Sequence, residues 1–309
     1  MTNLGTSDLD VSRLALGGNV FGWTADEESS FAVLDAYTAA GGNFVDTADV
    51  YSAWAPGHSG GESESVVGRW LASRGNRDSV VVATKVGMLD GLDNLKAATI
   101  QTAAENSLRR LGVDHIDLYY AHQDDLETPQ EETLAAFDAL VRSGKVRHIA
   151  ASNFTAERLA SALAVSEREG LARYVALQQH YNLVERSYEG ELRAAVEAGG
   201  LASAPYWGLA KGFLTGKYRP GVEVESVRAA AASKYLDDRG LRVLAALDEV
   251  AAAHDTTVAA VALAWLATQP TVAAPIASAR NVDQLNDLLP ALDLELKADE
   301  VERLSAASA

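Results

Sequence analysis

The chain alternates short apolar segments of strand character with amphipathic helical segments along nearly all of its 309 residues. Eight strand–helix units follow one another without a linker or a longer internal repeat. Short, almost continuous apolar strands are typical of a parallel sheet covered by helices. We therefore predict one α/β domain over residues 1–309, a (β/α)8 TIM barrel. The expected strands are residues 14–16, 43–45, 78–85, 115–121, 146–151, 174–177, 201–204 and 272–276.

Two further features belong to this prediction. Residues 4–11 have the pattern of a short N-terminal β-hairpin with a turn at Ser7-Asp8, which would cap one end of the barrel. A long loop, residues 207–232, follows the seventh strand. The alternative fold is a doubly wound open sheet, which usually has a Gly-x-Gly-x-x-Gly turn after its first strand. Residues 17–22 read Gly-Gly-Asn-Val-Phe-Gly and lack that spacing.

Composition excludes several classes of function. The formal net charge is −17, and such a surface repels nucleic acid and anionic membranes. Without cysteine there is no disulfide, no thiolate nucleophile and no cysteine-based metal site. Residues 1–13 lack the pattern of a secretion signal and no apolar run reaches membrane-spanning length, so we expect a cytoplasmic protein. A metal site is not expected, because the following histidines lack ligand spacing: His58, His115, His148, His180 and His254.

Polar residues follow the predicted strands at their carboxyl ends. In a barrel these ends meet at one mouth, where functional residues gather. Each residue alone has an ordinary structural explanation, such as a turn cap or a buried histidine. Lysine and histidine at the ends of buried strands are harder to explain together. The strand ends supply Asp46, Lys85, His122, Ser152, Asn153, Gln178 and Tyr206, with Tyr51 on the loop after Asp46.

Four of these residues make a plausible proton-transfer device. The phenol of Tyr51 is a weak acid with an ordinary pKa of about 10. The ammonium of Lys85 beside it would favour the phenolate and ease proton donation. Asp46 would keep Lys85 charged and oriented, and His122 could orient a carbonyl oxygen. Such a group can protonate an oxygen that is becoming an alkoxide.

In this order and on these strand ends, the quartet Asp46, Tyr51, Lys85 and His122 resembles the aldo-keto reductase superfamily. The resemblance extends over nearly the whole chain. It implies a (β/α)8 barrel that binds a nicotinamide cofactor without a Rossmann fold. The remaining segments that carry it are Leu4–Ser7, Phe44–Tyr51, Ala151–Phe154, Gln178–Leu183 and Gly212–Tyr218.

The resemblance also implies where the cofactor would lie. Ser152, Asn153 and Gln178 would hold the nicotinamide carboxamide, and Tyr206 would stack on the ring. The glycine-rich segment 208–217 would pass across the pyrophosphate, and segment 275–284 would meet the adenosine end. A hydroxyl and a guanidinium in that last segment suit a 2′-phosphate, which favours NADP over NAD. The cofactor residues expected in these two segments are Leu209, Lys211, Gly212, Ser278, Arg280 and Gln284.

The implied activity is reversible reduction of aldehydes or ketones to alcohols, with Tyr51 as general acid. Trp23, Trp54 and Trp207 would form an apolar wall for a small carbonyl or alcohol substrate. Two rival functions stay open. The first is a cofactor-holding sensor or regulatory subunit with little turnover, and the second is a lyase or aldolase that uses Lys85 as a Schiff-base amine. The natural substrate, the direction and the oligomeric state are not predicted.

Overall fold

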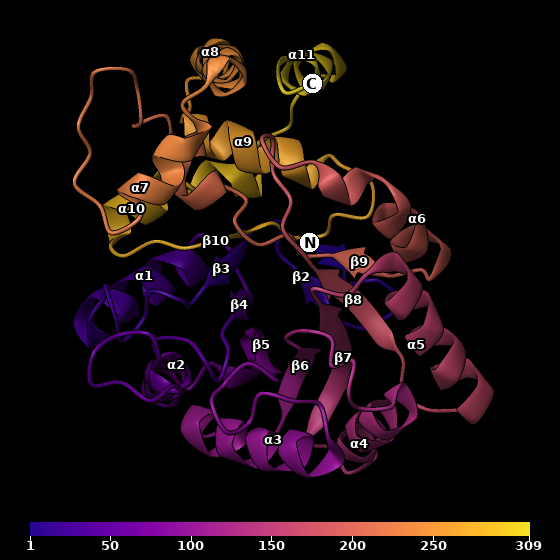
Figure 1. Ribbon diagram of the computed structural model, residues 1–309. Helices are drawn as coiled ribbons and strands as arrows, with labels where there is room; N and C mark the ends of the chain where they lie inside the picture. The colour runs from indigo at the N-terminus through magenta and orange to yellow at the C-terminus, as the bar shows by residue number, and fades with distance from the viewer.

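The computed structural model describes residues 1–309 and contains one eight-stranded parallel sheet (Figure 1). Neighbouring strands follow one another in chain order, except that the last strand lies beside the first. The predicted order of strands is therefore confirmed. The strands are β3 (Ala15–Gly17), β4 (Phe44–Asp46), β5 (Val81–Val86), β6 (Ile116–Ala121), β7 (Val146–Ser152), β8 (Tyr174–Gln178), β9 (Ala202–Ser203) and β10 (Ile276–Ala277).

The sheet closes on itself between β9 and the segment that leads into β10. Ser203 donates its backbone N–H to the carbonyl of Thr271 at 2.7 Å and accepts from Ala273 at 2.9 Å. Ile276 donates to the carbonyl of Pro205 at 2.8 Å. These bonds satisfy backbone groups that an open sheet edge would expose. The expected (β/α)8 barrel is confirmed.

The N-terminal hairpin covers the amino end of the barrel, as predicted. β1 (Thr2–Asn3) pairs antiparallel with β2 (Asp10–Val11). Leu4, Leu9 and Val11 are buried in one cluster with inward-facing strand residues such as Phe44 and Leu118. Many other residues of this cluster are alanines, so small side chains fill much of this part of the barrel interior and the apolar residues of the hairpin pack against them.

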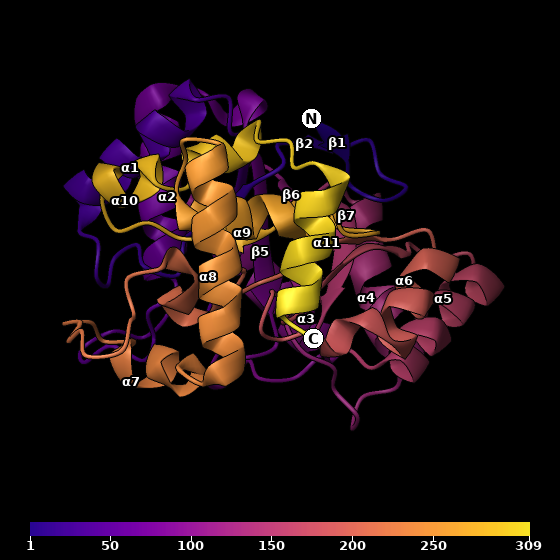
Figure 2. The ribbon, with the colours of Figure 1, turned by 90° about the horizontal axis from the view of Figure 1, so that it is seen from above.

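Helices surround the strands and bury their apolar faces in a second, larger cluster (Figure 1). Several begin at a side-chain cap: Asp26 accepts from the N–H of Ser29 at 2.9 Å and Asp237 from Gly240 at 2.7 Å. Figure 2 shows α8 and α11 side by side, at the outside of this layer. The helices are α1 (Glu27–Ala39), α2 (Glu62–Arg74), α3 (Ala97–Leu111), α4 (Gln130–Arg142), α5 (Ala156–Glu169), α6 (Glu191–Ala198), α7 (Ala229–Ala232), α8 (Asp238–Ala253), α9 (Val258–Ala267), α10 (Val282–Asn286) and α11 (Ala298–Ala307).

Two predicted strands differ from the observed ones by more than one residue at an end. The strand predicted from residue 78 begins at Val81, because Arg77–Ser79 form a 3₁₀ turn. The strand predicted over 272–276 is shifted, and β10 covers only Ile276–Ala277. The residues before it make the closing bonds to β9 rather than a continuous ladder. Apolar side chains alone do not distinguish these arrangements.

No single helix is long and apolar enough to span a bilayer. The successive helices α8 and α9 would together meet the requirements of length and composition, but they are bent by 97° relative to each other.

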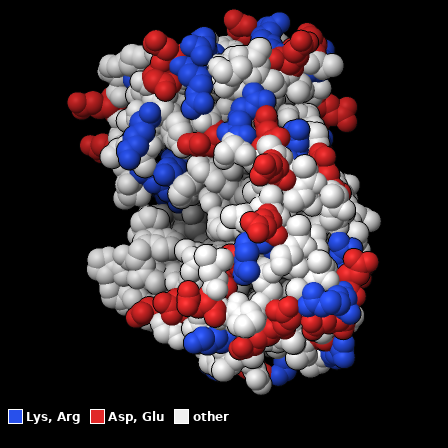
Figure 3. Space-filling view, turned by 45° about the vertical axis from the view of Figure 1, so that its right-hand side comes forward, with Lys and Arg blue, Asp and Glu red and all other residues white.

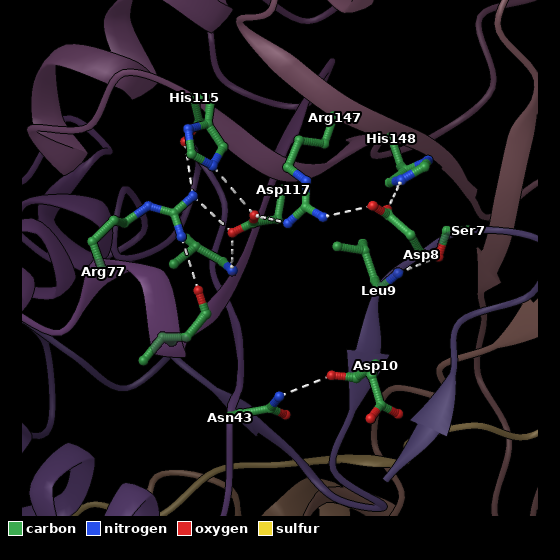
Figure 4. Close-up of polar contacts among 12 residues, drawn as sticks. Ser7, Asp8, Leu9, Asp10, Asn43, Arg77, His115, Asp117, Arg147 and His148 are labelled. Atoms are coloured by element: carbon green, nitrogen blue, oxygen red, sulfur yellow. Dashed lines mark hydrogen bonds and ion pairs between the residues drawn. The ribbon is translucent and has the colours of Figure 1, made fainter.

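A network of charged side chains joins the hairpin to β6 and β7 at the amino end of the barrel (Figure 4). The carboxylate of Asp117 is 3% exposed and pairs with Arg77 at 2.7 Å and with Arg147 at 2.9 Å. It also accepts the N–H of Val82 at 2.9 Å. Arg147 reaches on to Asp8 of the hairpin at 3.1 Å. Asp117 is thus the buried centre of this network.

Replacing Asp117 with asparagine should lower the free energy of unfolding by about 3 kcal/mol, because two arginines lose their buried partner. The matched control is Asp8→Asn at the exposed end of the same network, where the carboxylate side chain is 72% exposed. That variant should lose less than about 1 kcal/mol. Urea unfolding followed by circular dichroism measures both. Equal losses for the two variants would contradict the central role of Asp117.

Candidate active site

The carboxyl ends of the strands converge at the mouth opposite the hairpin and carry most of the predicted site residues. Asp46 is the last residue of β4, and Lys85 lies one residue before the end of β5. His122 directly follows β6. Ser152 ends β7 and Gln178 ends β8. The parallel register thus brings residues more than 130 positions apart into one site.

Asp46, Lys85 and Tyr51 form a compact hydrogen-bonded group. The ammonium of Lys85 donates to Asp46 Oδ2 at 2.8 Å, to the carbonyl of Thr47 at 2.8 Å and to the Tyr51 hydroxyl at 2.9 Å. The Tyr51 hydroxyl in turn donates to Asp46 Oδ2 at 3.1 Å. Lys85 is 0% exposed and Asp46 is 1% exposed, so this ion pair lies in a low-dielectric interior. The predicted grouping of these three residues is present.

The direction of the Tyr51 pKa shift is opposite to the one that the sequence suggested. Burial raises the pKa of Tyr51 well above its ordinary value, and the carboxylate of Asp46 raises it further. The phenol is therefore protonated at neutral pH, which a proton donor requires. Burial lowers the pKa of Lys85, and Asp46 offsets part of this effect. The ion pair with Asp46 at 2.8 Å places an ammonium beside the phenol oxygen, where it can stabilise a phenolate.

His122 lies beside Tyr51, with the two ring centroids 6.1 Å apart. It is buried, and its Nδ1 has no hydrogen-bond partner. Burial, and then the charge of Lys85, lower the pKa of His122 well below its ordinary value. A neutral imidazole at this place can orient a carbonyl oxygen without adding charge.

Two of the three predicted substrate tryptophans lie together beside Tyr51. The rings of Trp23 and Trp54 meet edge to face at 5.4 Å, and Trp54 lies 6.2 Å from the Tyr51 ring. Trp54 is 49% exposed. These two rings form an apolar wall beside the Tyr51 ring. Trp207 belongs to a different cluster.

The residues expected to hold a nicotinamide carboxamide are linked to one another at the mouth. Asn153 donates from Nδ2 to the carbonyl of His122 at 2.9 Å and accepts the hydroxyl of Tyr206 at 2.8 Å. Its φ of 60° is in the left-handed region, which asparagine tolerates. Gln178 donates from Nε2 to Asp46 Oδ1 at 2.9 Å. Its Oε1 is therefore the atom left to accept an amide N–H, while the Ser152 hydroxyl accepts from Asn153 Nδ2 at 3.1 Å.

Sequence reasoning missed a histidine that supports Tyr206. The ring of His180 stacks on the Tyr206 ring, with centroids 5.6 Å apart and planes 12° apart. Trp207 meets both rings edge to face, at 5.0 and 5.4 Å. The ammonium of Lys211 lies 4.1 Å from the centroid of Trp207. The signal was the spacing of His180, two residues after Gln178 at the end of β8.

Backbone strain is concentrated in the segment that follows Tyr206. Trp207, Ala210 and Lys211 have φ values of 52°, 47° and 59°. Positive φ costs a non-glycine residue about 1–3 kcal/mol and usually marks a functional segment. The carbonyl of Trp207 is held by Asn182 Nδ2 at 2.9 Å. Gly212 has a φ of 101°, and a side chain there would meet nothing closer than 3.7 Å, which leaves room over this backbone.

Basic residues gather near the predicted adenosine end. Burial, and then the charges of Arg280 and Arg228, lower the pKa of Lys217, so the three side chains lie close to one another. None of the three makes an ion pair with a carboxylate. Figure 3 shows a hollow on one face of the molecule, with Lys and Arg side chains along its upper edge. Arg228 was not predicted, because it lies in the long loop after β9, where no periodicity marks it.

The other residues predicted at this end have mostly local partners. Ser278 donates from its hydroxyl to Asn19 at 2.7 Å, and Gln284 accepts the backbone N–H of Arg280 at 3.1 Å. Leu209 is half-buried against the core. These contacts shape the loops around the basic cluster, whose charged groups are left free of acidic partners.

Comparison with known proteins identifies the family. The sequence model of the Aldo/keto reductase family matches residues 13–309 of this chain. The chain belongs to the aldo/keto reductase family. The uncharacterized oxidoreductase YrpG of Bacillus subtilis is 36% identical over 313 residues, which cover 98% of this chain and 94% of the relative. Norsolorinic acid reductase stcV of Emericella nidulans is 33% identical over 308 residues, which cover 94% and 76%.

A third relative is the probable voltage-gated potassium channel subunit beta of Oryza sativa subsp. japonica. It is 33% identical over 304 residues, which cover 94% of this aldo/keto reductase and 90% of the relative. Family membership and the relatives named as oxidoreductases make this aldo/keto reductase an oxidoreductase. Members of the family generally use NAD(P)H.

Proposed function

We propose that this protein is an NADPH-dependent carbonyl reductase that reversibly converts aldehydes or ketones to alcohols, with Tyr51 as general acid. The observation that carries this proposal is the hydrogen-bonded group of Asp46, Lys85 and Tyr51 at the barrel mouth. A neutral, protonated phenol held by a buried ammonium suits one task in particular. It can give a proton to an oxygen that gains negative charge.

The proton path follows from the hydrogen bonds. The Tyr51 hydroxyl now donates to Asp46, so its proton must turn about the C–O bond to reach a substrate oxygen. Lys85 keeps donating to the same phenol oxygen and stabilises the phenolate that remains. Asp46 and the Thr47 carbonyl hold the ammonium in place. His122 places the carbonyl oxygen near Tyr51, and the Trp23–Trp54 wall excludes water from one side.

The residues at the mouth fit a nicotinamide dinucleotide. When bound, its reduced form supplies the hydride for the carbonyl carbon. Gln178 Oε1 and the Asn153 side chain suit a carboxamide, and Tyr206, supported by His180, offers a flat ring for stacking. At the far end, three cations without acidic partners suit a phosphate. That cluster supports NADP as the cofactor, with NAD as the alternative.

Arg280→Ala should raise the Kd for NADPH by about 10- to 100-fold, the usual range for a lost charged hydrogen bond. The Kd for NADH, which lacks the 2′-phosphate, should stay near its wild-type value. Arg228→Ala should act in the same direction. A matched control is Arg219→Ala in the same loop, because Arg219 is already paired with Asp248 at 2.7 Å. Titration of intrinsic tryptophan fluorescence measures all four proteins.

Equal losses of NADPH and NADH affinity in Arg280→Ala and Arg228→Ala would contradict recognition of the 2′-phosphate. Such losses would indicate that these arginines contact the pyrophosphate, which both cofactors share. A loss in the Arg219→Ala control would point to distortion of the loop.

A regulatory subunit with little turnover is the second candidate, and the rice channel-subunit relative favours it. A steady-state assay with NADPH and a panel of aldehydes and ketones separates the two. Turnover of any panel member supports the reductase, whereas tight NADPH binding without turnover supports the regulatory role. The aldolase hypothesis is less favoured, because three hydrogen bonds already engage the Lys85 amine. Borohydride trapping of a covalent substrate adduct on Lys85 would support the aldolase hypothesis.

A further inference from the structure

Asn182 is a buried polar side chain that the proposed mechanism does not use. It lies in the loop that follows β8 and is 0% exposed. Its Oδ1 accepts the backbone N–H of Val184 at 2.9 Å. Because a backbone N–H can only donate, this bond fixes which end of the amide is oxygen and which is nitrogen. The two amide hydrogens of Asn182 are therefore on the atom that faces away from Val184.

Two acceptors lie within reach of these two hydrogens. Asn182 Nδ2 is 2.9 Å from the carbonyl oxygen of Trp207 and 3.3 Å from Nε2 of His180. An amide nitrogen only donates, so Nε2 of His180 has to accept, and the ring is neutral with its proton on Nδ1. Burial lowers the pKa of His180, Glu185 opposes this and Lys211 adds to it. The hydrogen bond from Asn182 thus selects one tautomer of His180.

Both groups that Asn182 holds are in contact with Tyr206. The His180 ring is stacked on the Tyr206 ring, and Trp207 meets that ring edge to face at 5.4 Å. The backbone of Trp207 has a φ of 52°, a strained conformation that persists only where neighbouring contacts hold it. Asn182 therefore joins the ring that stacks on Tyr206 to the strained turn that follows Tyr206.

The Tyr206 ring is also held at its hydroxyl end. The hydroxyl donates to Asn153 Oδ1 at 2.8 Å. The residue is half-buried, so part of the ring remains open at the mouth. With His180 against one face of the ring, the opposite face is the one that can receive a flat nicotinamide. A tilt of the Tyr206 ring would therefore tilt the nicotinamide that stacks on it.

We propose that Asn182 is a positioning residue for the nicotinamide, because it holds His180 and the Trp207 carbonyl so that Tyr206 presents one fixed ring face. This inference rests on the proposed function, in which the nicotinamide stacks on Tyr206. Asn182 is buried and acts only through its two aromatic neighbours. Binding of the adenosine end of the cofactor should not depend on it.

The test is Asn182→Ala, which removes both N–H donors. The Kd for NADPH should rise about 3- to 10-fold, the size of one aromatic stacking contact. The Kd for adenosine 2′,5′-bisphosphate, which carries the 2′-phosphate but lacks the nicotinamide, should stay at its wild-type value. His180→Ala should show the same pattern. The double variant should lose less affinity for NADPH than the two single losses combined, because Asn182 acts through His180. Isothermal titration calorimetry measures all of these constants.

Asn43→Ala is the matched control at the amino end of the barrel (Figure 4). Asn43 has the same bonding pattern, because its Oδ1 accepts the N–H of Ser12 at 2.8 Å and its Nδ2 donates to the carbonyl of Asp10 at 2.9 Å. This variant should leave both Kd values unchanged.

Three results would overturn the proposal. They are wild-type-like NADPH binding in Asn182→Ala, an equal loss of NADPH and bisphosphate affinity in that variant, and additive losses in the double variant with His180→Ala. Absence of NADPH binding by the wild-type protein would refute the proposed function itself, and this inference with it.

The wild-type protein provides a second test that does not depend on the folding of a variant. In 15N-histidine-labelled protein without cofactor, the ring nitrogens of His180 should show a neutral imidazole at pH 7 with the proton on Nδ1. A charged ring, or a ring with its proton on Nε2, would contradict the hydrogen bond from Asn182.

Discussion

Tyr51→Phe should lower kcat for carbonyl reduction by about 10²- to 10⁴-fold, the usual contribution of a general acid. The phenylalanine ring keeps the packing against Trp54 and His122 and removes only the hydroxyl. The Kd for NADPH should stay near the wild-type value, because the cofactor residues lie on other strand ends. Steady-state kinetics and fluorescence titration with the same enzyme preparation measure the two quantities.

The matched control for this experiment is Tyr120→Phe. Tyr120 is a second buried tyrosine, whose ring lies 5.7 Å from the Lys85 ammonium, and its hydroxyl has no hydrogen-bond partner. Its removal should leave kcat close to the wild-type value. Wild-type-like turnover in Tyr51→Phe would eliminate Tyr51 as the proton donor. A large loss of kcat in Tyr120→Phe would indicate that the Tyr120 phenol also takes part in carbonyl reduction.

The position of the site could be predicted from the sequence because a barrel obeys a geometric rule. Each parallel strand ends at the same mouth, so Asp46, Lys85 and His122 meet however far apart they lie along the chain. The strand–helix alternation was enough to predict the barrel itself. Strand boundaries were less accurate, as at Val272–Ile276, where the ladder depends on how the last segment closes against β9.

The electrostatics of the site could not be predicted in the same way. A lysine beside a tyrosine suggested a lowered phenol pKa, but burial and the Asp46 carboxylate act in the opposite direction. Their balance depends on depth and distance, which residue types do not encode. Arg228 and His180 were missed for a related reason. Arg228 lies in an irregular loop where no periodicity marks it, and His180 contributes through ring stacking, which its spacing from Gln178 does not reveal by itself.

Lys85→Met should destabilise the protein by about 3–5 kcal/mol and also abolish most carbonyl reduction. The substitution preserves the apolar stem but leaves the Asp46 carboxylate buried without its cation. Tyr51 loses the donor that stabilises its phenolate at the same time. Thermal unfolding and steady-state kinetics therefore both change, and the single variant cannot separate structure from chemistry.

The double variant Lys85→Met/Asp46→Asn separates them. Neutralising Asp46 removes the unpaired buried charge, so most of the lost unfolding free energy should return. Gln178 Nε2 can still donate to the side-chain oxygen at position 46. Turnover should not return, because no cation remains to stabilise the Tyr51 phenolate. Recovery of turnover together with stability would mean that the ion pair serves only the fold, and Tyr51 would then have to act without Lys85.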